Sequence, residues 1–291
     1  MAAMTVAFQG ELGAYSEQAS REFFGRDIDV SPSPAFPEVF DKVTSGAVDA
    51  GMIPIENSLA GSIHENYDLL LENDLHIIGE LKLRIVHHLI ANQGVGLDEV
   101  RRVISHPQAL AQCRDYLRSL KNVTVEPVYD TAGAVRQVKN SGARDVAAIA
   151  SAQAAVDYGL TILKSGIESN HQNYTRFLAI SREPRSETGD KVSIVLSLQH
   201  HPGMLFKALG VFALRDIDLM KIESRPLTGT PWQYLFYIDI AGSLEEQRIQ
   251  KALDHMGEIT TLLRVLGCYP NGRIADGSSV IVRKSSPGGS S

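Results

Sequence analysis

The stretch DAGMIPIENSLAGSIHEN, residues 49–66, decides the fold of this chain. Its run of methionine and isoleucine predicts a buried strand. Pro54 marks the end or an edge of that strand, because proline has no amide hydrogen to give to a sheet ladder. Ser62 and Glu65 have the S-x-x-E spacing of a capping box, which predicts the start of a helix. A strand that leads into a helix indicates an open α/β sheet, and such sheets bind ligands at the carboxyl ends of their strands.

Glu56, Asn57 and Ser58 follow this apolar run, so a carboxylate, an amide and a hydroxyl lie at the predicted end of the strand. If all three reach the crevice, they form a candidate substrate site. A polar turn between a strand and a helix would have the same composition. The stretch alone supports both interpretations equally.

The composition is that of an ordinary globular protein. At 291 residues the chain is long enough for two domains, one of them bilobed. Hydrophobic residues make up 44% and charged residues 21%. The net charge is -6, and no basic stretch alternates with aromatic residues, so we do not expect nucleic acid as a partner. A locally positive pocket for a small anion is compatible with this charge.

The two cysteines, Cys113 and Cys268, form no C-x-x-C pair, which fits a reducing compartment. The sequence passes from Met1 almost directly into a predicted strand. It shows no signal peptide, no transit peptide and no apolar run long enough to span a membrane. We therefore expect a cytoplasmic protein with no membrane partner.

No cofactor motif is visible. His87 and His88 are adjacent, so they would point to opposite faces of a strand and make poor co-ligands of a metal. In QGELGAYSEQ (9–18), Gly10 and Gly13 follow the first strand, but their spacing lacks the full G-x-G-x-x-G of a dinucleotide site. Backbone amides there could hold an anion, and a tight structural turn is an equally good interpretation. We expect no metal and no organic cofactor.

The first two-thirds of the chain alternate strands with helices, which predicts a mainly parallel α/β structure covered by helices. The expected strands are 4–8, 49–55, 76–91, 101–105, 123–128, 146–150 and 176–181. The expected helices are 15–24, 36–46, 62–72, 107–120, 131–140 and 151–158.

The composition changes at SREPRSETGD (181–190), which has the polar, aperiodic character of a linker. We expect a first domain over 1–182, a linker over 183–190 and a second domain over 191–270. The second domain has a strand–helix–strand–strand–helix–strand pattern, the ferredoxin-like arrangement, with a turn at TGTP (228–231). The Gly- and Ser-rich tail, 271–291, is expected to be disordered, although SSVIVRK within it could dock on a sheet edge.

The segment ISHPQALAQC (104–113) places Ser105 and His106 at the end of a predicted strand. Gln108 and Gln112 are four residues apart and share one face of the following helix. These residues could line the same crevice as the first motif. In the alternative interpretation, His106 is a surface helix cap and the glutamines are solvated.

The segment NYTRFLAIS (173–181) has a polar run before an apolar strand. Thr175 suits a strand because it is β-branched, and this is the simplest interpretation of it. Arg176 could clamp a carboxylate, since its planar fork matches carboxylate geometry, or it could form a structural ion pair.

Together these segments resemble prephenate dehydratase, including its close relative arogenate dehydratase. The resemblance covers residues 4–270 in order. The residues that carry it are GELGAYSE (10–17), GMIPIENSLAGSI (51–63), SHPQALAQC (105–113), NYTRFLAIS (173–181), HPGMLFKAL (201–209) and KIESRP (221–226).

The resemblance implies two α/β lobes around a cleft, similar to periplasmic binding proteins, and a decarboxylating hydro-lyase that converts prephenate to phenylpyruvate. It implies that Thr175 is the central catalytic residue. It also implies that the other catalytic residues are Glu56, Asn57, Ser105 and Gln112, and that the substrate-binding residues are Ser58, His106, Arg176, Gly13, Ala14 and Tyr15. No mutase segment precedes the first strand, so the monofunctional form is expected.

The second domain resembles the ACT regulatory domain of this family, which binds phenylalanine. The implied effector residues are Gly203, Met204, Leu205, Phe206, Glu223, Ser224, Arg225 and Pro226. Met204 and Phe206 depart from the family's usual Gly-Ala-Leu-Val, which leaves the strength and sign of the effect open. The resemblance implies a homodimer or a homotetramer.

Three other functions stay open at this point. Arogenate dehydratase would make phenylalanine directly. A non-catalytic amino-acid sensor could share the cleft and the regulatory domain, since fold does not settle function. A regulatory subunit of another enzyme is the third. The joint presence of Glu56, Asn57, Gln112 and Thr175 favours an enzyme, and turnover by the isolated chain separates the alternatives.

Overall fold

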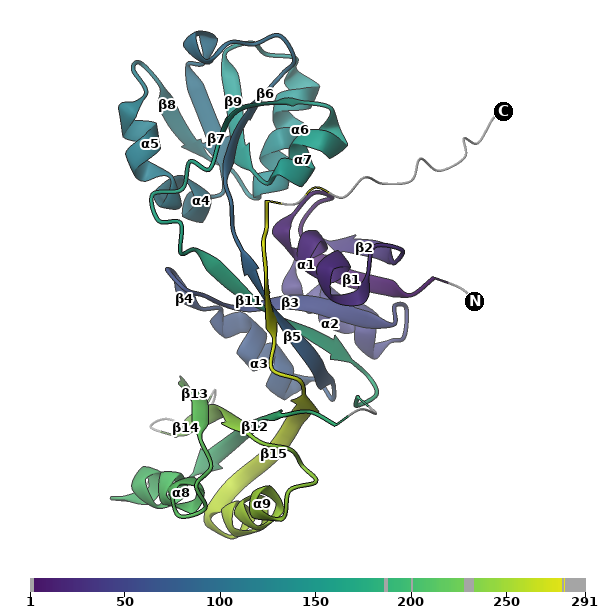
Figure 1. Cartoon of the computed structure of the whole chain (residues 1–291), viewed down its shortest axis with the longest axis vertical. Coiled ribbons are helices and arrows are strands. Elements are labelled where there is room, and N and C mark those ends of the chain that lie inside the picture. Colours follow the sequence, from purple (N-terminus) through teal and green to yellow (C-terminus); the bar gives the residue numbers. More distant parts are fainter. Residues whose placement is uncertain (1–2, 186–187, 200, 228–232, 279, 281–291) are drawn as a thin grey trace.

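The computed structural model describes residues 3–185, 188–199, 201–227, 233–278 and 280. The molecule is elongated and has three units in a row (Figure 1). We call them the upper lobe, the middle lobe and the C-terminal unit, after their places in the figure. In the described part of the chain, no helix is both long enough and apolar enough to cross a membrane.

The middle lobe is built on a sheet with the strand order β16-β5-β11-β3-β1-β2, in which β4 also pairs with β3. β3 runs parallel to β1, whereas β11 runs antiparallel to both β3 and β5. The strands are β1 (Thr5–Gln9), β2 (Asp29–Ser33), β3 (Ala50–Asn57), β4 (Gly61–Ser62), β5 (His76–Arg84), β11 (Tyr174–Ser181) and β16 (Arg273–Ala275). The helices are α1 (Tyr15–Phe24), α2 (Phe36–Thr44) and α3 (His64–Glu72).

The upper lobe has a second sheet in the order β10-β6-β9-β7-β8. Two segments, 85–87 and 166–173, cross between the lobes and bond to each other through Ile167 N and His87 O at 3.0 Å. The strands are β6 (His88–Ala91), β7 (Arg102–Ser105), β8 (Thr124–Pro127), β9 (Val146–Ala150) and β10 (Thr161–Ser165). The helices are α4 (Pro107–Gln112), α5 (Arg114–Ser119), α6 (Thr131–Ser141) and α7 (Ala152–Tyr158), with a 3-10 turn at Leu97–Glu99.

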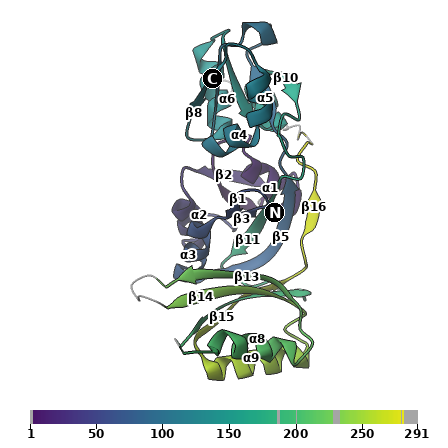
Figure 2. The same ribbon diagram turned by 90° about the vertical axis from the view of Figure 1, so that its left-hand side faces the viewer.

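The C-terminal unit has the predicted strand–helix–strand–strand–helix–strand order around an antiparallel sheet, β13-β14-β12-β15. One face of this sheet carries both helices, and the other face lies against the middle lobe (Figure 2). Tyr237, Leu266 and Tyr269 belong to the same buried cluster as Phe40 and Ile53 of the middle lobe. The elements are β12 (Lys191–Leu198), α8 (Met204–Ala213), β13 (Leu219–Pro226), β14 (Tyr234–Ala241), α9 (Gln247–Ile259) and β15 (Thr260–Tyr269).

The predicted α/β class and the ferredoxin-like order are confirmed. The prediction of a mainly parallel structure is wrong, because β11 and β6 run antiparallel to both of their neighbours and make the two sheets mixed. Four local predictions are also wrong. The expected strand 76–91 is two strands, β5 and β6, that belong to different lobes. The expected helix 107–120 is divided at Cys113 into α4 and α5. The predicted capping box is absent, because Ser62 pairs in β4 and α3 begins only at His64.

The C-terminal tail is the fourth correction. Residues Arg273–Ala275 form β16, which pairs in parallel with Leu81–Leu83 of β5, so this part of the tail is ordered. Ala275 is buried in the core of the middle lobe. The predicted turn at 228–231 and the tail beyond 280 lie outside the described residues.

Candidate active site

A small pocket of about 110 Å³ lies at the junction of the two lobes. It is lined by residues from the end of β3, the start of β11, the crossing segment 85–87 and the first turns of α1, α4 and α6. Its lining residues are Tyr15, Asn57, Ile85, His87, His106, Gln108, Ala109, Gln112, Thr131 and Thr175. The sequence motifs around 15, 57, 106–112 and 175 therefore converge on one place.

The centre of the pocket is a pair of cross-strand neighbours, Asn57 on β3 and Thr175 on β11. Asn57 Oδ1 accepts the backbone amides of Leu59 and Ala60, each at 3.0 Å. These two bonds fix which way the side-chain amide points, because only an oxygen can accept there. The Nδ2 group therefore donates to Thr175 Oγ1 at 3.0 Å and to Asn173 Oδ1 at 2.8 Å.

The same reasoning orients a chain of hydrogen bonds across the hinge. The side-chain amide of Gln112 lies 3.5 Å from Asn57 Oδ1, and only its Nε2 can donate to that oxygen. The other end of the amide, Oε1, therefore faces His87 Nε2 at 2.8 Å. Burial lowers the pKa of His87, so its ring is neutral at neutral pH. A neutral ring that donates through Nε2 must accept at Nδ1, where the Tyr15 hydroxyl lies at 3.0 Å. That hydroxyl has a single hydrogen, which it donates either to His87 Nδ1 or to the carbonyl oxygen of Val86 at 2.7 Å.

This hydrogen-bond network determines how the Thr175 hydroxyl can be used. Its oxygen accepts from Asn57, so its own hydrogen is left for donation into the pocket. Thr175 is only 8% exposed, which keeps competing water away from the hydroxyl. Thr175 is thereby an oriented hydrogen-bond donor.

His106 lies at the N-terminus of α4, where its Nδ1 accepts the amide of Gln108 at 3.2 Å. In the neutral ring the hydrogen must then be on Nε2. Burial lowers the pKa of His106, while the nearby Asp130 opposes that shift. His106 combines the helix-cap role of the alternative interpretation with a place in the pocket.

Glu56 and Arg176 are the clearest corrections among the predicted site residues, because neither lines the pocket. Glu56 pairs with Lys221 of β13 at 2.9 Å, and Arg176 pairs with Glu80 and Asp239. The physical reason is the period of a strand. Asn57 and Thr175 face the pocket, so the residues before and after them face away. The ion-pair interpretation of Arg176 is confirmed.

Ser105 and Ser58 also lie outside the pocket lining. The buried Ser105 hydroxyl donates to the carbonyl of Ile149 at 2.6 Å and so ties β7 to β9. The Ser58 hydroxyl donates to the carbonyl of Gln172 and accepts the amide of Tyr174, both at 2.9 Å. Both serines hold backbone segments that carry pocket residues.

Gly13 and Ala14 form a contact between the lobes, and Tyr15 alone of this trio lines the pocket. Gly13 has φ +88°, and an added Cβ would lie 2.7 Å from Ala154 Cα of the upper lobe. Its carbonyl accepts the Ser151 hydroxyl at 2.6 Å. Glycine is needed here because the backbones of the two lobes touch.

His87 and Thr131 line the pocket but were not predicted as site residues. His87 was considered only as a metal ligand beside His88. His87 lies within an apolar stretch that shows no sign of a hinge. A prediction that this stretch divides into β5 and β6 would have placed His87 between the two lobes. Thr131, the first residue of α6 after the Asp130 cap, carries the helix-start signal of many ordinary helices.

The eight predicted effector residues do not converge within one copy of the chain. Glu223 accepts the Ser62 hydroxyl, and Arg225 pairs with Asp68 at 2.6 Å, so both face the middle lobe. Ser224 and Pro226 alternate to the other side and are exposed. Gly203, Met204, Leu205 and Phe206 lie at the start of α8.

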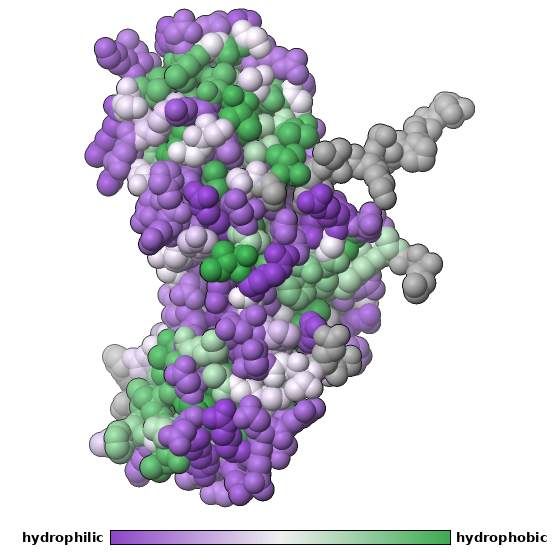
Figure 3. All heavy atoms as spheres, viewed as in Figure 1, coloured by the Kyte–Doolittle hydropathy of each residue, from purple (hydrophilic) through white to green (hydrophobic). Residues whose placement is uncertain are grey.

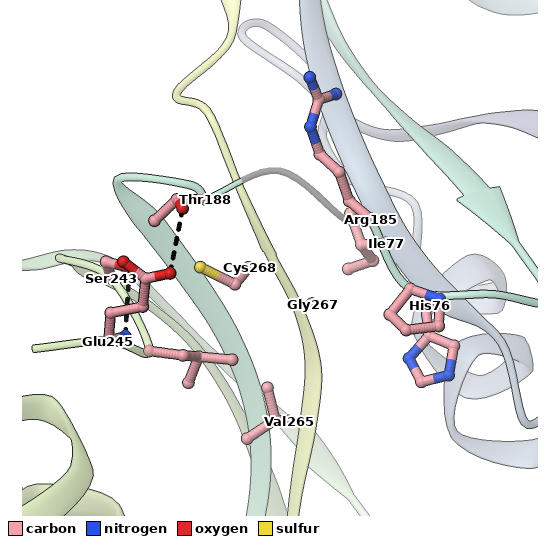
Figure 4. A pocket seen from close by; sticks show the side chains of 11 residues that line it. His76, Ile77, Arg185, Thr188, Ser243, Glu245, Val265, Gly267 and Cys268 are labelled. Atoms are coloured by element: carbon pink, nitrogen blue, oxygen red, sulfur yellow. Dashed lines mark hydrogen bonds between the residues drawn. The ribbon is translucent and has the colours of Figure 1, made fainter.

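A larger pocket of about 350 Å³ lies where the middle lobe meets the C-terminal unit (Figure 4). Arg185 and His76 lie on one side of it, and Thr188 and Glu245 lie on the other, where they share a hydrogen bond of 3.2 Å (Figure 4). The polar groups thus lie on opposite sides of the pocket and do not converge on one point. Convergent polar groups mark a reaction site, so we place the site at the hinge.

The fold and the hinge pocket define a two-lobed α/β ligand-binding architecture with an appended ferredoxin-like unit. The prephenate dehydratase family model matches residues 6–185, and this chain belongs to the prephenate dehydratase family. The predicted family is confirmed, and with it the predicted enzyme class, a dehydratase.

Two similar proteins support this assignment, and a third shares the fold under a different description. Arogenate dehydratase/prephenate dehydratase 2, chloroplastic, of Arabidopsis thaliana is 49% identical over 277 residues, which cover 91% of this chain and 72% of that protein. The solved prephenate dehydratase of Arthrobacter aurescens, in complex with L-Phe, has a TM-score of 0.85 at 33% identity and covers 92% of this chain and 90% of its own. A solved structure described as a quorum quenching acylase has a TM-score of 0.85 at 34% identity, covering 92% of this chain and 98% of its own.

Proposed function

We propose that this chain converts prephenate to phenylpyruvate, carbon dioxide and water at the hinge pocket. The observation that carries the proposal is the fixed Asn57 amide, which donates to Thr175 Oγ1 and leaves the threonine hydrogen for the substrate. Asn57, Gln112 and Thr175 keep their predicted catalytic roles in this proposal. Glu56 and Ser105 are left out because they lie outside the pocket.

The difficult step is expulsion of the ring hydroxyl as the ring carboxylate departs. The carbon–carbon bond to the carboxylate breaks, its electron pair enters the ring, and the carbon–oxygen bond to the hydroxyl breaks on the other side. Carbon dioxide leaves, and the hydroxyl takes one proton to become water. Thr175 stabilises the charge that develops on the leaving oxygen, and preorganised donors of this kind supply a large share of catalysis.

The proton must come from a titratable group or from solvent. His106 can deliver it only in its doubly protonated form, in which Nδ1 releases the Gln108 amide; in the neutral ring the Nε2 hydrogen can only bond to the leaving oxygen, and solvent supplies the proton. Positioned proton transfer contributes a factor of roughly 10²–10⁴ to the rate. The first turns of α1, α4 and α6 border the pocket, so the positive ends of three helix dipoles lie toward the two substrate carboxylates, although the amides of Gln108, Ala132 and Gly133 are already bonded to their helix caps.

The lining of the pocket favours prephenate over arogenate. The two substrates differ in a side-chain keto group and an ammonium group. Among the described residues that line the pocket, none is a carboxylate that would pair with the ammonium. Arogenate dehydratase activity is the second candidate, because the similar plant proteins carry that name.

Turnover of the purified chain on prephenate and on arogenate tests the proposal. Phenylpyruvate formed faster than phenylalanine supports the prephenate reaction. Faster formation of phenylalanine from arogenate would keep the chemistry and change the substrate. Absence of product from both substrates would favour the alternatives of a non-catalytic sensor or a regulatory subunit.

The domain division and the effector site belong to the same proposal. Residues 1–182 would form the catalytic domain, 183–190 the linker and 191–270 an ACT domain that binds phenylalanine. The solved Arthrobacter aurescens relative is a complex with L-Phe, which supports phenylalanine as the effector. The effector would contact Gly203, Phe206, Glu223 or Ser224 and their neighbours in the two motifs. Ser224→Ala should weaken the phenylalanine response and leave the turnover without phenylalanine unchanged. If both are lost together, the sensor is not separable from the catalyst.

We place the subunit contact of a homodimer or homotetramer at α8. Phe206 on this helix is 80% exposed, and Leu214, which directly follows the helix, is 86% exposed. Hydrophobic atoms gather on the α8 side of the C-terminal unit, whereas the α9 side is hydrophilic (Figure 3). Light scattering of the wild type and of Phe206→Glu tests this: the variant should shift to monomer.

A cytoplasmic location is also part of the proposal. The names of several similar plant proteins describe them as chloroplastic. Fractionation of source cells tests the location, and enrichment of the protein in an organelle would refute it.

A further inference from the structure

Behind Thr175, on the opposite face of β11, lies a buried group of charges that joins the middle lobe to the C-terminal unit. Arg176 donates from Nε to Glu80 Oε2 at 2.6 Å and lies 2.7 Å from Asp239 Oδ2. Lys191 lies 2.5 Å from the other oxygen of Glu80. We call Glu80, Arg176, Lys191 and Asp239 the interdomain ion cluster.

The cluster is enclosed and balanced. Its two carboxylates match its two cations, and the side chains of Glu80 and Lys191 are 0% and 3% exposed. Asp239 also accepts the Ser193 hydroxyl, and Glu80 Oε1 accepts the amide of Gly272 at 2.8 Å. Two members come from the middle lobe (β5 and β11) and two from the C-terminal unit (β12 and β14).

Stability alone is a poor explanation for such a cluster. Desolvation of buried charges costs about as much as their attraction returns, and apolar residues of similar volume often replace them without loss. An apolar contact is already present, because Tyr237 and Leu266 pack in the shared core with Ile53. What charged, hydrogen-bonded contacts add to an apolar interface is a defined geometry.

The geometry that the cluster fixes is that of the strand carrying Thr175. Thr175 pairs with Asn57 on one side and with Leu83 on the other. The register of β11 against β3 shifts between Arg176 and Phe177, so the strand is irregular directly after the proposed catalytic residue. Bulges re-aim neighbouring side chains, and a misplacement of about 1 Å can cost on the order of a hundredfold in rate.

We propose that Asp239 and Lys191 of the C-terminal unit are positioning residues for Thr175, acting through Arg176 and Glu80. The C-terminal unit is then a structural part of the active site as well as a place for an effector. This inference rests on the proposed function, in which the Thr175 hydroxyl assists departure of the ring hydroxyl. The ion cluster would hold the Thr175 hydroxyl in place for that step.

The test uses the full chain and a charge-balanced double variant, Lys191→Met with Asp239→Asn. It removes one cation and one carboxylate, so the Arg176–Glu80 pair that remains is neutral overall. We expect kcat to fall tenfold or more with KM within about twofold, because substrate binding is left intact while the hydroxyl is displaced. The matched control is Glu126→Gln, which breaks an exposed ion pair to Arg102 in the upper lobe and should leave both constants within twofold.

A second measurement separates positioning from general damage. In a Thr175→Ala background the double variant should lower kcat no further, because the hydroxyl that it displaces is already gone. A full additional loss of kcat in the Thr175→Ala background would overturn the inference. An unchanged kcat when the double variant is made in the otherwise wild-type chain would also overturn it. Absence of product from the wild type itself would instead reject the proposed function. The single variant Asp239→Asn provides the same test if the double variant does not fold.

Discussion

Replacing Asn57 by aspartate changes the direction of the hydrogen bond at the proposed active site with almost no change in shape. In the wild type the Asn57 amide donates to Thr175 Oγ1 at 3.0 Å and to Asn173 Oδ1 at 2.8 Å. Asn57→Asp turns this donor into a carboxylate oxygen. The Thr175 hydroxyl hydrogen would then point at the introduced carboxylate and away from the substrate. Asn173 can turn its own amide, whose Nδ2 has no partner among the described residues, toward that carboxylate.

The size of the effect follows from the bond that the substrate must displace. A hydrogen bond to a charged group is worth about 1.5–3 kcal/mol. If the leaving oxygen must compete with that bond, kcat falls by about 10- to 150-fold. KM should change little, because the lost interaction forms mainly as the carbon–oxygen bond breaks.

The assay is steady-state formation of phenylpyruvate from prephenate, with thermal unfolding measured on the same samples. Asn122→Asp, on an exposed turn of the upper lobe, is the matched amide-to-acid control and should keep wild-type constants. At acid pH the introduced carboxyl group becomes protonated and can donate again, so part of the lost activity should return relative to wild type. A folded Asn57→Asp enzyme with kcat within twofold of wild type would refute the reasoning.

Three further outcomes are expected. Thr175→Ala should lower kcat a hundredfold or more with little change in KM, while Thr175→Ser should keep measurable turnover because it keeps the hydroxyl; steady-state kinetics of both variants decide this. Glu56→Gln should keep kcat within a few-fold, since Glu56 pairs with Lys221 outside the pocket, and a loss as large as that of Thr175→Ala would restore Glu56 to the mechanism. His88 is buried, neither ring nitrogen has a partner in the described part of the chain, and burial lowers its pKa. Its stabilising contribution is therefore present above the unfolded pKa of about 6.5 and is lost as pH falls through the lower folded pKa. His88→Met should flatten the decline in unfolding free energy between about pH 6.5 and pH 5, measured by urea denaturation, and an unchanged slope would contradict this.

Local patterns predicted most of the elements. Helix α1 was expected at 15–24 and begins and ends there, because a Gly-containing turn precedes it and Gly25 follows its last residue. The ferredoxin-like order was read from alternating and amphipathic stretches and is the order found. Division of the apolar run 76–91 between two lobes was missed, since no glycine or proline marks the crossing.

The site was predicted in part. Thr175, Asn57, Gln112, His106 and Tyr15 converge as expected from the resemblance. The exclusion of Glu56 and Arg176 follows from the strand period alone and could have been deduced from the sequence once one pocket residue on each strand was accepted.

The sequence by itself determined which segments become strands and helices and which polar residues end them, because those choices depend on neighbours a few residues away. Only the tertiary structure decided what those polar residues contact. Glu56 meets Lys221, Arg176 meets Asp239, and His87 meets Gln112, and each of these pairs brings together residues far apart in the chain. Such contacts depend on how the lobes and the C-terminal unit pack, and no local pattern specifies that packing.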